Sequence, residues 1–309
     1  MTGGGWMIVG LDRASYFAPR GKHRLMILGN IIVQRYLTPE DRLIGLIGES
    51  GAGKSLLIRG MFPGLVLTND DDGINVRPLP ILRDYEDGIF RTHTYHLDAR
   101  FELAFVQPWR LVDAVTQAIH QDKRVVIEHF ELLYPLIGIN AEMLVGIGED
   151  VIVIRPNIFG PDPHDLAREV FATITYRRMA HSAEDLTSIA LQEMGLSHPE
   201  IHSDVKRGFL LEFLQQPQVD LTAVEARVKG FIERDVRIAY YDDEHIQVDD
   251  LVYQCSGPRI HISHAGEIVG FRILPDFRYD PLNKMFLLAG LVGEDACRIR
   301  HEVLDPGEG

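Results

Sequence analysis

Apolar residues follow two different spacings along the first half of the chain. Helical spacing, with an apolar residue every three to four positions, runs through 25–36 and again through 109–121. Short continuous apolar runs occupy 43–47, 65–68, 124–128 and 151–154. Runs of this length are typical of strands that are buried on both faces. Strands alternating with helices predict an α/β domain with a mostly parallel, helix-covered sheet.

The pattern changes after residue 156. The stretch 156–163 is the richest in proline and glycine, and we place a domain boundary between residues 162 and 163. Helical spacing returns from 165 to 181 and beyond 221. Short alternating strands then follow at 244–248, 251–254, 261–263 and 270–274. Helices followed by strands indicate an α+β domain with an antiparallel sheet over residues 163–309.

A phosphate-binding motif of the form G-x-x-x-x-G-K-[ST] directly follows the apolar run at 43–47. Its eight residues are Gly48, Glu49, Ser50, Gly51, Ala52, Gly53, Lys54 and Ser55. The glycines let the backbone approach an anion, and the following helix N-terminus presents positive charge to it. Lys54 can reach the β- and γ-phosphates, and the Ser55 hydroxyl can join the coordination of Mg²⁺. The sequence therefore predicts that residues 1–162 form a P-loop NTPase domain that binds ATP or GTP with magnesium.

Phosphoryl transfer also needs acidic residues beside the loop. Glu128 ends the run at 124–128, at the strand edge where open α/β sheets place their ligands. We predict that it orients the metal, with a purely structural role as the alternative. The aspartates at 70–72 follow the run at 65–68, although Asn-Asp-Gly sequences also favour solvated turns. Our catalytic candidates are Lys54, Glu128 and, from this group, Asp71.

Two family resemblances meet in this domain. Leu28-Gly29-Asn30, the segment 37–41, the phosphate loop and Arg59-Gly60 together resemble the small bacterial ATPase that assists threonylcarbamoyl modification of tRNA. The segment 125–130 is similar to the strand of uridine-kinase-like enzymes, which have an acidic residue after their second strand. Both resemblances imply a P-loop fold. They imply different reactions, so NTP hydrolysis and phosphoryl transfer to a small molecule stay open.

The second domain carries residue types that ligate zinc. His181 and Asp185 are spaced i and i+4, which puts them on one face of a predicted helix. Cys255 and His261 lie far downstream, before Gly266-Glu267-Ile268. Two ligands from a helix and two from a strand and its loop make up a tetrahedral zinc site.

These residues resemble the second additional domain of alanyl- and threonyl-tRNA synthetases and its free-standing editing relatives. That family carries H-x-x-x-H on a helix and C-x-x-x-H before a Gly-Glu-Ile stretch, and the resemblance covers about 167–274. Asp185 stands where the family has its second helix histidine. Counted from Cys255, the family spacing places the other histidine at Arg259, and His261 lies two residues further on. Because a carboxylate can ligate zinc, three alternatives stay open: the site binds zinc, it has lost its metal, or it binds a harder ion. His264 is a spare candidate ligand. The resemblance implies metal-assisted cleavage of an aminoacyl-tRNA ester.

Bulk composition narrows the choice of partners. A net charge of −14 argues against a surface that coats nucleic acid, so we expect no DNA partner, and RNA binding would need a local basic patch. The two cysteines, Cys255 and Cys297, imply no disulfide framework. There is no signal-peptide pattern and no apolar stretch of membrane-spanning length. We therefore expect a cytoplasmic protein with no membrane partner.

The whole chain is similar to a bacterial group named for its alanyl-tRNA-synthetase-type second additional domain. The leading hypothesis is an NTP-hydrolysing protein whose C-terminal metal-binding domain recognises an aminoacyl-tRNA or a related aminoacyl ester. Recognition alone and recognition with hydrolysis of the ester both stay open. The alternative is a kinase for a nucleoside or amino-acid type of small molecule, with the C-terminal domain as a substrate or regulatory module. A third hypothesis is a nucleotide-gated sensing protein with negligible turnover.

Overall fold

The computed structural model of the chain describes residues 13–69, 76–196, 199, 201–205 and 207–294. Two compact units emerge: Met1–Ala18 with Lys22–Thr173, and Pro19–Gly21 with Ile174–Gly309. Each is described by itself. Among the described helices, none combines the length and the apolar composition needed to cross a bilayer.

The first unit is built around a six-stranded sheet with the order β1-β6-β5-β2-β4-β3. Its strands are β1 Arg13–Phe17, β2 Leu43–Gly48, β3 Thr94–Asp98, β4 Arg124–Glu128, β5 Met143–Ile147 and β6 Asp150–Ile154. Strands β3, β4, β2 and β5 run parallel, whereas β6 and β1 are antiparallel to their neighbours. Every residue of β2, β4 and β5 is buried, as expected for strands covered on both faces.

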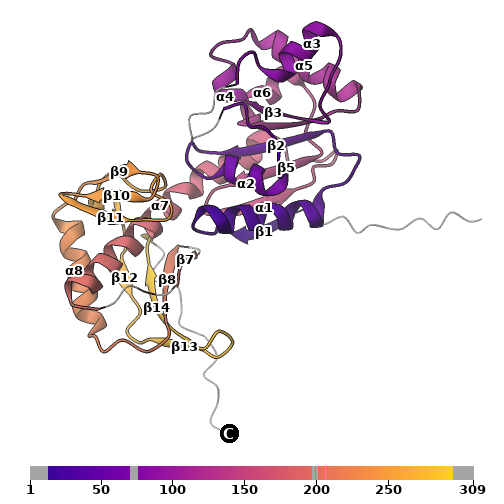
Figure 1. Cartoon of the computed structure of the whole chain (residues 1–309). Helices are drawn as coiled ribbons and strands as arrows, with labels where there is room; N and C mark the ends of the chain where they lie inside the picture. Colours follow the sequence, from indigo (N-terminus) through magenta and orange to yellow (C-terminus); the bar gives the residue numbers. More distant parts are fainter. Residues whose placement is uncertain (1–12, 70–75, 197–198, 200, 206, 295–309) are drawn as a thin grey trace, which may run out of the picture. The chain divides into compact units, whose positions relative to one another are not determined.

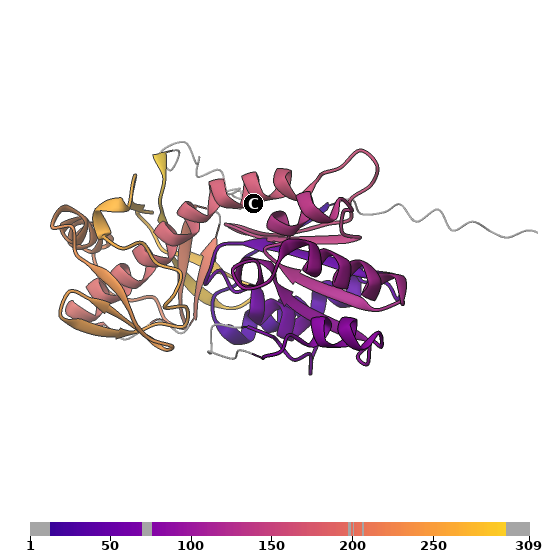
Figure 2. The ribbon, with the colours of Figure 1, turned by 90° about the horizontal axis from the view of Figure 1, so that it is seen from above.

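Helices cover both faces of this sheet (Figures 1 and 2). The helices are α1 Lys22–Tyr36, α2 Lys54–Met61, α3 Pro80–Asp87, α4 Ala99–Glu102, α5 Pro108–His120, α6 Phe130–Ile137 and the start of α7 Pro163–Glu193. Side chains of α3, α5, α6 and α7 share one apolar core with the sheet, while α1 and α2 lie on the other side (Figure 1). The phosphate-binding motif lies in the turn between β2, a buried strand of this sheet, and α2, a helix that covers it.

Helices α1 and α2 pack backbone to backbone. A Cβ added at Gly29 of α1 would collide with the Leu57 carbonyl oxygen, and one added at Gly60 of α2 would collide with the Met26 carbonyl oxygen. Only glycine leaves room for this approach. The two helices therefore meet closely at both positions.

Two of the strand predictions for this unit were wrong. The run at 65–68 forms no strand, and the chain forms β3 at Thr94–Asp98 instead. Val66 is 63% exposed, and the Thr68 N–H donates at 3.1 Å to the side chain of His96 on β3, not to the backbone of a strand as in a sheet. The run at 151–154 does form a strand, but an antiparallel one, because it follows β5 through a tight turn.

The described residues of the second unit form two antiparallel sheets. One has the order β11-β10-β9 and the other β12-β14-β8-β7, with β13 also pairing with β14. The strands are β7 Ile201–Val205, β8 Gly208–Phe213, β9 Ile238–Asp242, β10 His245–Val248, β11 Leu251–Gln254, β12 Arg272–Ile273, β13 Arg278–Asp280 and β14 Met285–Leu291. Residues of both sheets form one core with α8 (Leu221–Glu233) and the C-terminal half of α7 (Figure 1).

The division between the units differs from the predicted boundary at 162/163. Helix α7 starts at Pro163 and continues without a break for 31 residues, and the units change at Thr173 and Ile174 within it. The physical reason is that proline fits the first turn of a helix, so the proline-rich stretch leads into a helix rather than a linker. Of the later predicted strands, 261–263 is a loop because its residues precede a short 3₁₀ helix, η1 Ala265–Glu267.

A buried carboxylate in the first unit gives a prediction for acid stability. Asp41 accepts two hydrogen bonds from Arg155, at 2.6 and 2.9 Å, and one from the Thr38 N–H at 2.7 Å. Burial acts to raise the pKa of Asp41, but these hydrogen bonds bring the pKa below its ordinary value. The lowered pKa means that Asp41 stabilises the fold above about pH 4 and that this contribution is lost as the pH falls through the folded-state pKa.

We expect Asp41→Asn to lower the free energy of unfolding by about 2 kcal/mol at pH 7, because a hydrogen-bonded charge is lost. Urea unfolding at several pH values checks this, and the gap from the natural protein should narrow below about pH 4. Asp122→Asn is the control, since that side chain is 89% exposed. A difference in the free energy of unfolding that stays constant with pH would contradict the role of the Asp41 charge.

Candidate phosphate and metal sites

The phosphate-binding motif forms the turn between β2, which ends at Gly48, and α2, which begins at Lys54. Gly51 and Gly53 have positive φ angles of 78° and 100°, a conformation that residues with a Cβ rarely adopt. Glycine is thus required at Gly51 and Gly53 by the backbone itself. The turn delivers the loop to the N-terminus of α2, where backbone N–H groups favour an anion.

Lys54 is buried at the base of this turn. Its Nζ donates to the carbonyl oxygens of Gly48 at 3.1 Å and Glu49 at 2.9 Å, and lies 3.8 Å from Glu128 Oε2. Hydrogen bonds from an ammonium to an anionic phosphate are stronger than those to neutral carbonyls. A phosphate in the loop would therefore compete well for this side chain.

Glu128, at the end of β4, contacts the motif through Ser55. The Ser55 hydroxyl donates to Glu128 Oε1 at 2.9 Å, and His96 Nε2 lies 3.2 Å from the same oxygen. The backbone N–H of Thr68 donates to His96 Nδ1, which leaves the ring proton on Nε2 to be donated to Glu128. Burial acts to raise the pKa of Glu128, but His96, Lys54 and Ser55 bring the pKa below its ordinary value. Glu128 is therefore a carboxylate at neutral pH, as a magnesium site requires.

These groups surround a hollow of about 70 Å³. Its lining residues are Ser50, Gly51, Gly53, Lys54, Ser55, Asn69, Asp98, Glu128 and His129. A space of this size admits a phosphoryl group, and a nucleoside would have to lie outside it. The predicted loop residues and Glu128 thus share one polar hollow.

Sequence reasoning did not mark Asp98, and it gave His96 and His129 no functional role, because neither histidine has a convincing partner spacing. Asp98 ends β3, accepts a hydrogen bond from the Asn69 side chain at 3.3 Å and caps α4 through the Phe101 N–H at 3.0 Å. It was missed because β3 was not predicted. His129 directly follows Glu128 with a positive φ of 55°, a strained conformation that clusters at functional sites. The predicted Asp71, with its neighbours at 70 and 72, lies outside the described residues.

In the second unit, the side chains of His181, Asp185, Cys255 and His261 lie together. His181 and Asp185 are one turn apart on α7, Cys255 directly follows β11, and His261 lies in the loop before η1. One ligand atom from each residue lies within 4.8 Å of all the others, and the cluster is buried. We call these four residues the metal cluster.

The spacing within the metal cluster is close to that of a zinc site. Cys255 Sγ lies 3.6 Å from His181 Nε2 and 3.8 Å from His261 Nε2. Zinc bonds of about 2.0–2.3 Å at tetrahedral angles place two ligand atoms about 3.3–3.6 Å apart. His261 Nε2 and Asp185 Oδ2, at 2.8 Å, form a direct hydrogen bond that a metal would replace. His181 Nε2 also donates to the Gly257 carbonyl at 3.1 Å, a hydrogen bond that a metal at Nε2 would replace. Metal binding would release a proton from the Cys255 thiol, because the thiolate is the ligand.

The charges around the cluster favour a cation. Burial, followed by the charge of Asp185, raises the pKa of the Cys255 thiol to about 12. Burial acts to raise the pKa of Asp185 as well, but Arg20 and the two histidines hold it well below its ordinary value. A divalent cation would reverse the preference of the thiol, because metal coordination stabilises the thiolate. The donor set of two imidazoles, a thiolate and a carboxylate suits zinc.

Arg20 is a further buried residue at the cluster that no sequence pattern indicated. Its Nη2 donates to Asp185 Oδ1 at 2.6 Å and to Cys255 Sγ at 3.2 Å, and its Nη1 forms an ion pair with Glu184. The side chains of Arg20 and Glu184 are each 1% exposed. Arg20 belongs to the second unit through the short segment Pro19–Gly21.

The structure does not bring His264 or Arg259 to the cluster. His264 is half exposed, with Nδ1 3.5 Å from Asp235, and its backbone N–H donates to Glu267 Oε1 of η1 at 2.9 Å. Arg259 pairs with Asp243 at 3.0 Å and lies over the ring of Tyr240. His261 is therefore the histidine that reaches Cys255, and the two extra residues between them are accommodated in the loop.

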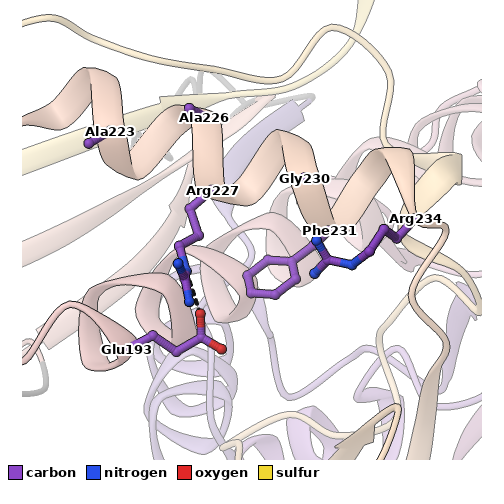
Figure 3. A pocket seen from close by; sticks show the side chains of 7 residues that line it. All are labelled: Glu193, Ala223, Ala226, Arg227, Gly230, Phe231 and Arg234. Atoms are coloured by element: carbon purple, nitrogen blue, oxygen red, sulfur yellow. Dashed lines mark hydrogen bonds and ion pairs between the residues drawn. The ribbon is translucent and has the colours of Figure 1, made fainter.

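The second unit also has a larger hollow of about 420 Å³ along α8 (Figure 3). Its lining residues are Glu193, Ala223, Ala226, Arg227, Gly230, Phe231 and Arg234. Arg227 is paired with Glu193 at 2.5 Å, and Arg234 lies over the ring of Phe231. Because its charged groups already contact one another or an aromatic ring, we assign no reaction to this hollow.

Comparison with models of known protein families gives no match, and comparison with curated proteins gives none either. Among solved structures, the chain is similar to the ornithine aminotransferase from Toxoplasma gondii ME49. The identity is 11% and the TM-score 0.21, over 80% of this chain and 68% of the aminotransferase chain. A similarity this low supports no conclusion about fold or function.

Proposed function

We propose that the protein binds a nucleoside triphosphate with Mg²⁺ at the hollow of the first unit and hydrolyses it. The observation that carries this proposal is the contact of Ser55 and Lys54 with the carboxylate of Glu128. Lys54 would neutralise the β- and γ-phosphates, and Ser55 and Glu128 would hold the magnesium ion. Asp71 remains a second candidate acid. The strand order, with β4 directly beside β2, supports this arrangement, because both parallel strands end at the same edge.

We expect Glu128→Gln to lower triphosphate turnover by about 100-fold or more while nucleotide binding persists, because a preorganised charge is lost. Phosphate release across a magnesium titration measures the first effect, and binding of a fluorescent nucleotide measures the second. Glu86→Gln is the control, since Glu86 is exposed and pairs with Arg110, away from the lining of the hollow. Equal turnover in Glu128→Gln and the natural protein would contradict the proposal.

For the second unit, we propose a zinc-type ion at the metal cluster and recognition of an aminoacyl-tRNA or a related aminoacyl ester. Support comes from the buried donor set and from its resemblance to the editing family. A bound zinc ion would supply Lewis acidity to polarise an ester carbonyl. Four protein ligands would fill the coordination shell and leave no position for water or substrate, which favours recognition. Hydrolysis would require Asp185 to dissociate from the ion. A cytoplasmic location fits this substrate.

Deacylation of mischarged alanyl-type tRNA tests the hydrolytic part of this proposal. Zinc-loaded protein is compared with chelator-treated protein and with buffer alone. A metal-dependent rate above both supports hydrolysis. Binding of the charged tRNA with no change in its deacylation rate restricts the second unit to recognition. The absence of both binding and deacylation would overturn the assignment.

A small-molecule kinase is the second candidate, favoured by Asp98. This carboxylate lines the same hollow as Glu128, at the end of the neighbouring strand, where a base for a substrate hydroxyl would be needed. Incubation with ATP labelled at the γ-phosphate and a panel of nucleosides and amino acids separates the candidates. A labelled small product supports the kinase, and free phosphate alone supports the hydrolase. Tight nucleotide binding without either product would indicate a sensing protein.

A further inference from the structure

We infer that Arg20 is a positioning residue of the metal cluster, holding Asp185 and Cys255 in the geometry that receives the ion. This inference rests on the proposed metal site and deepens it. The guanidinium reaches two of the four cluster residues at once, since its Nη2 contacts Asp185 Oδ1 at 2.6 Å and Cys255 Sγ at 3.2 Å. A planar guanidinium fixes such partners better than a flexible ammonium.

The contact with Asp185 decides which carboxylate oxygen faces the ion. Arg20 occupies Oδ1, and Oδ2 lies 2.8 Å from His261 Nε2 within the cluster. Asp185 can thus offer one oxygen to a metal while the other stays bound to Arg20. Hydrogen bonds of this kind orient metal ligands and tune their affinity.

Arg20 also balances the buried charge. A dication with the Cys255 thiolate and the Asp185 carboxylate is neutral, and Arg20 with Glu184 adds a second neutral pair. Buried charges are tolerated when they are paired and hydrogen-bonded. The loaded cluster therefore reaches neutrality with the residues that surround it.

The local backbone supports this role. Arg20 as a whole is 2% exposed, and the following Gly21 has a positive φ of 87° and lies beside Ser256, the residue after Cys255. The segment Pro19–Gly21 therefore forms part of the wall around the cluster. Its sequence distance from Asp185, 165 positions, makes it a component that a fragment confined to residues 163–309 would lack.

Full-length Arg20→Met and Arg20→Lys test the inference, with Arg13→Met as the matched control because Arg13 forms an exposed ion pair with Glu169. Zinc affinity is measured by competition with a chromophoric chelator, and the visible spectrum of the Co²⁺-substituted protein reports the ligand geometry. We expect Arg20→Met to bind zinc about 10- to 100-fold more weakly and to change the Co²⁺ spectrum. Arg20→Lys should fall between it and the natural protein, and Arg13→Met should match the natural protein.

Circular dichroism and thermal unfolding of the chelated proteins establish that each variant folds. If Arg20→Met does not fold, Arg20→Lys decides, because it keeps the positive charge and loses the planar pair of nitrogens that contacts Glu184 through Nη1 and the cluster through Nη2. Natural zinc affinity and an unchanged Co²⁺ spectrum in the folded variant would overturn the role of Arg20. Failure of the natural protein to bind zinc or Co²⁺ would instead overturn the proposed metal site itself.

Discussion

Replacing Lys54 with alanine is expected to reduce nucleoside triphosphate hydrolysis by about 100-fold or more, because the charge nearest the phosphates is lost. Lys54 is 5% exposed and is held by two loop carbonyls, so its ammonium is already in place before a phosphate arrives. Preorganised charge of this kind costs little reorganisation during the reaction. Phosphate release at saturating magnesium measures turnover, and a fluorescent nucleotide measures affinity.

The control for this prediction is Lys22→Ala, which removes an exposed lysine at the start of α1. Its turnover should equal that of the natural protein. Thermal unfolding shows whether Lys54→Ala remains folded, since the substitution also takes a positive charge away from the buried Glu128. A folded Lys54→Ala protein with natural turnover would show that the hollow is not the site of hydrolysis.

The second large effect is expected for Cys255→Ala, which should abolish stoichiometric zinc binding. The thiolate is the only sulfur donor in the metal cluster, and its loss leaves two imidazoles and one carboxylate. Elemental analysis of the purified protein measures bound zinc directly. Zinc at a thousand times its dissociation constant would stabilise the natural protein by about 4 kcal/mol, and Cys255→Ala should lose most of this gain.

His264→Ala is the matched control for the metal prediction. His264 lies in the same loop region as His261, but its ring is directed at Asp235 rather than at the cluster. Zinc content and the effect of a chelator on thermal unfolding should stay as in the natural protein. If Cys255→Ala keeps one zinc per chain while His264→Ala loses it, the ligand set proposed above is wrong.

The sequence was most informative where local spacing carries the chemistry. The phosphate-binding motif needs a strand, a glycine-rich turn and a helix in immediate succession, so its surroundings could be predicted from a few neighbouring residues. The edge strand β3 escaped prediction because His96 and Asp98 interrupt its apolar character. The apolar run at 65–68 was predicted as a strand instead, because a short apolar run does not reveal whether it pairs with another strand.

The cluster residues illustrate the opposite limit. His181 and Asp185 share a helix face by spacing alone, and the family resemblance supplied Cys255 and His261. Arg20 could not be found in this way, because a single arginine in a loop carries no pattern and its contacts are fixed only by the folded chain. The extent of α7 escaped for a related reason: a proline at its start resembles a linker until the helix that follows is known.

The glycines where α1 meets α2 bear on the meaning of the first resemblance. Gly29 and Gly60 belong to the Leu28-Gly29 and Arg59-Gly60 pairs on which the predicted resemblance to the tRNA-modification ATPase was based. Each has a steric explanation, since any larger side chain would push one helix away from the carbonyls of the other. Such dipeptides would be demanded by any enzyme built with this helical junction, whatever bond it breaks. They report how the two helices pack and say nothing about the reaction. The choice between hydrolase and kinase depends on the acidic residues of the hollow, Glu128 and Asp98.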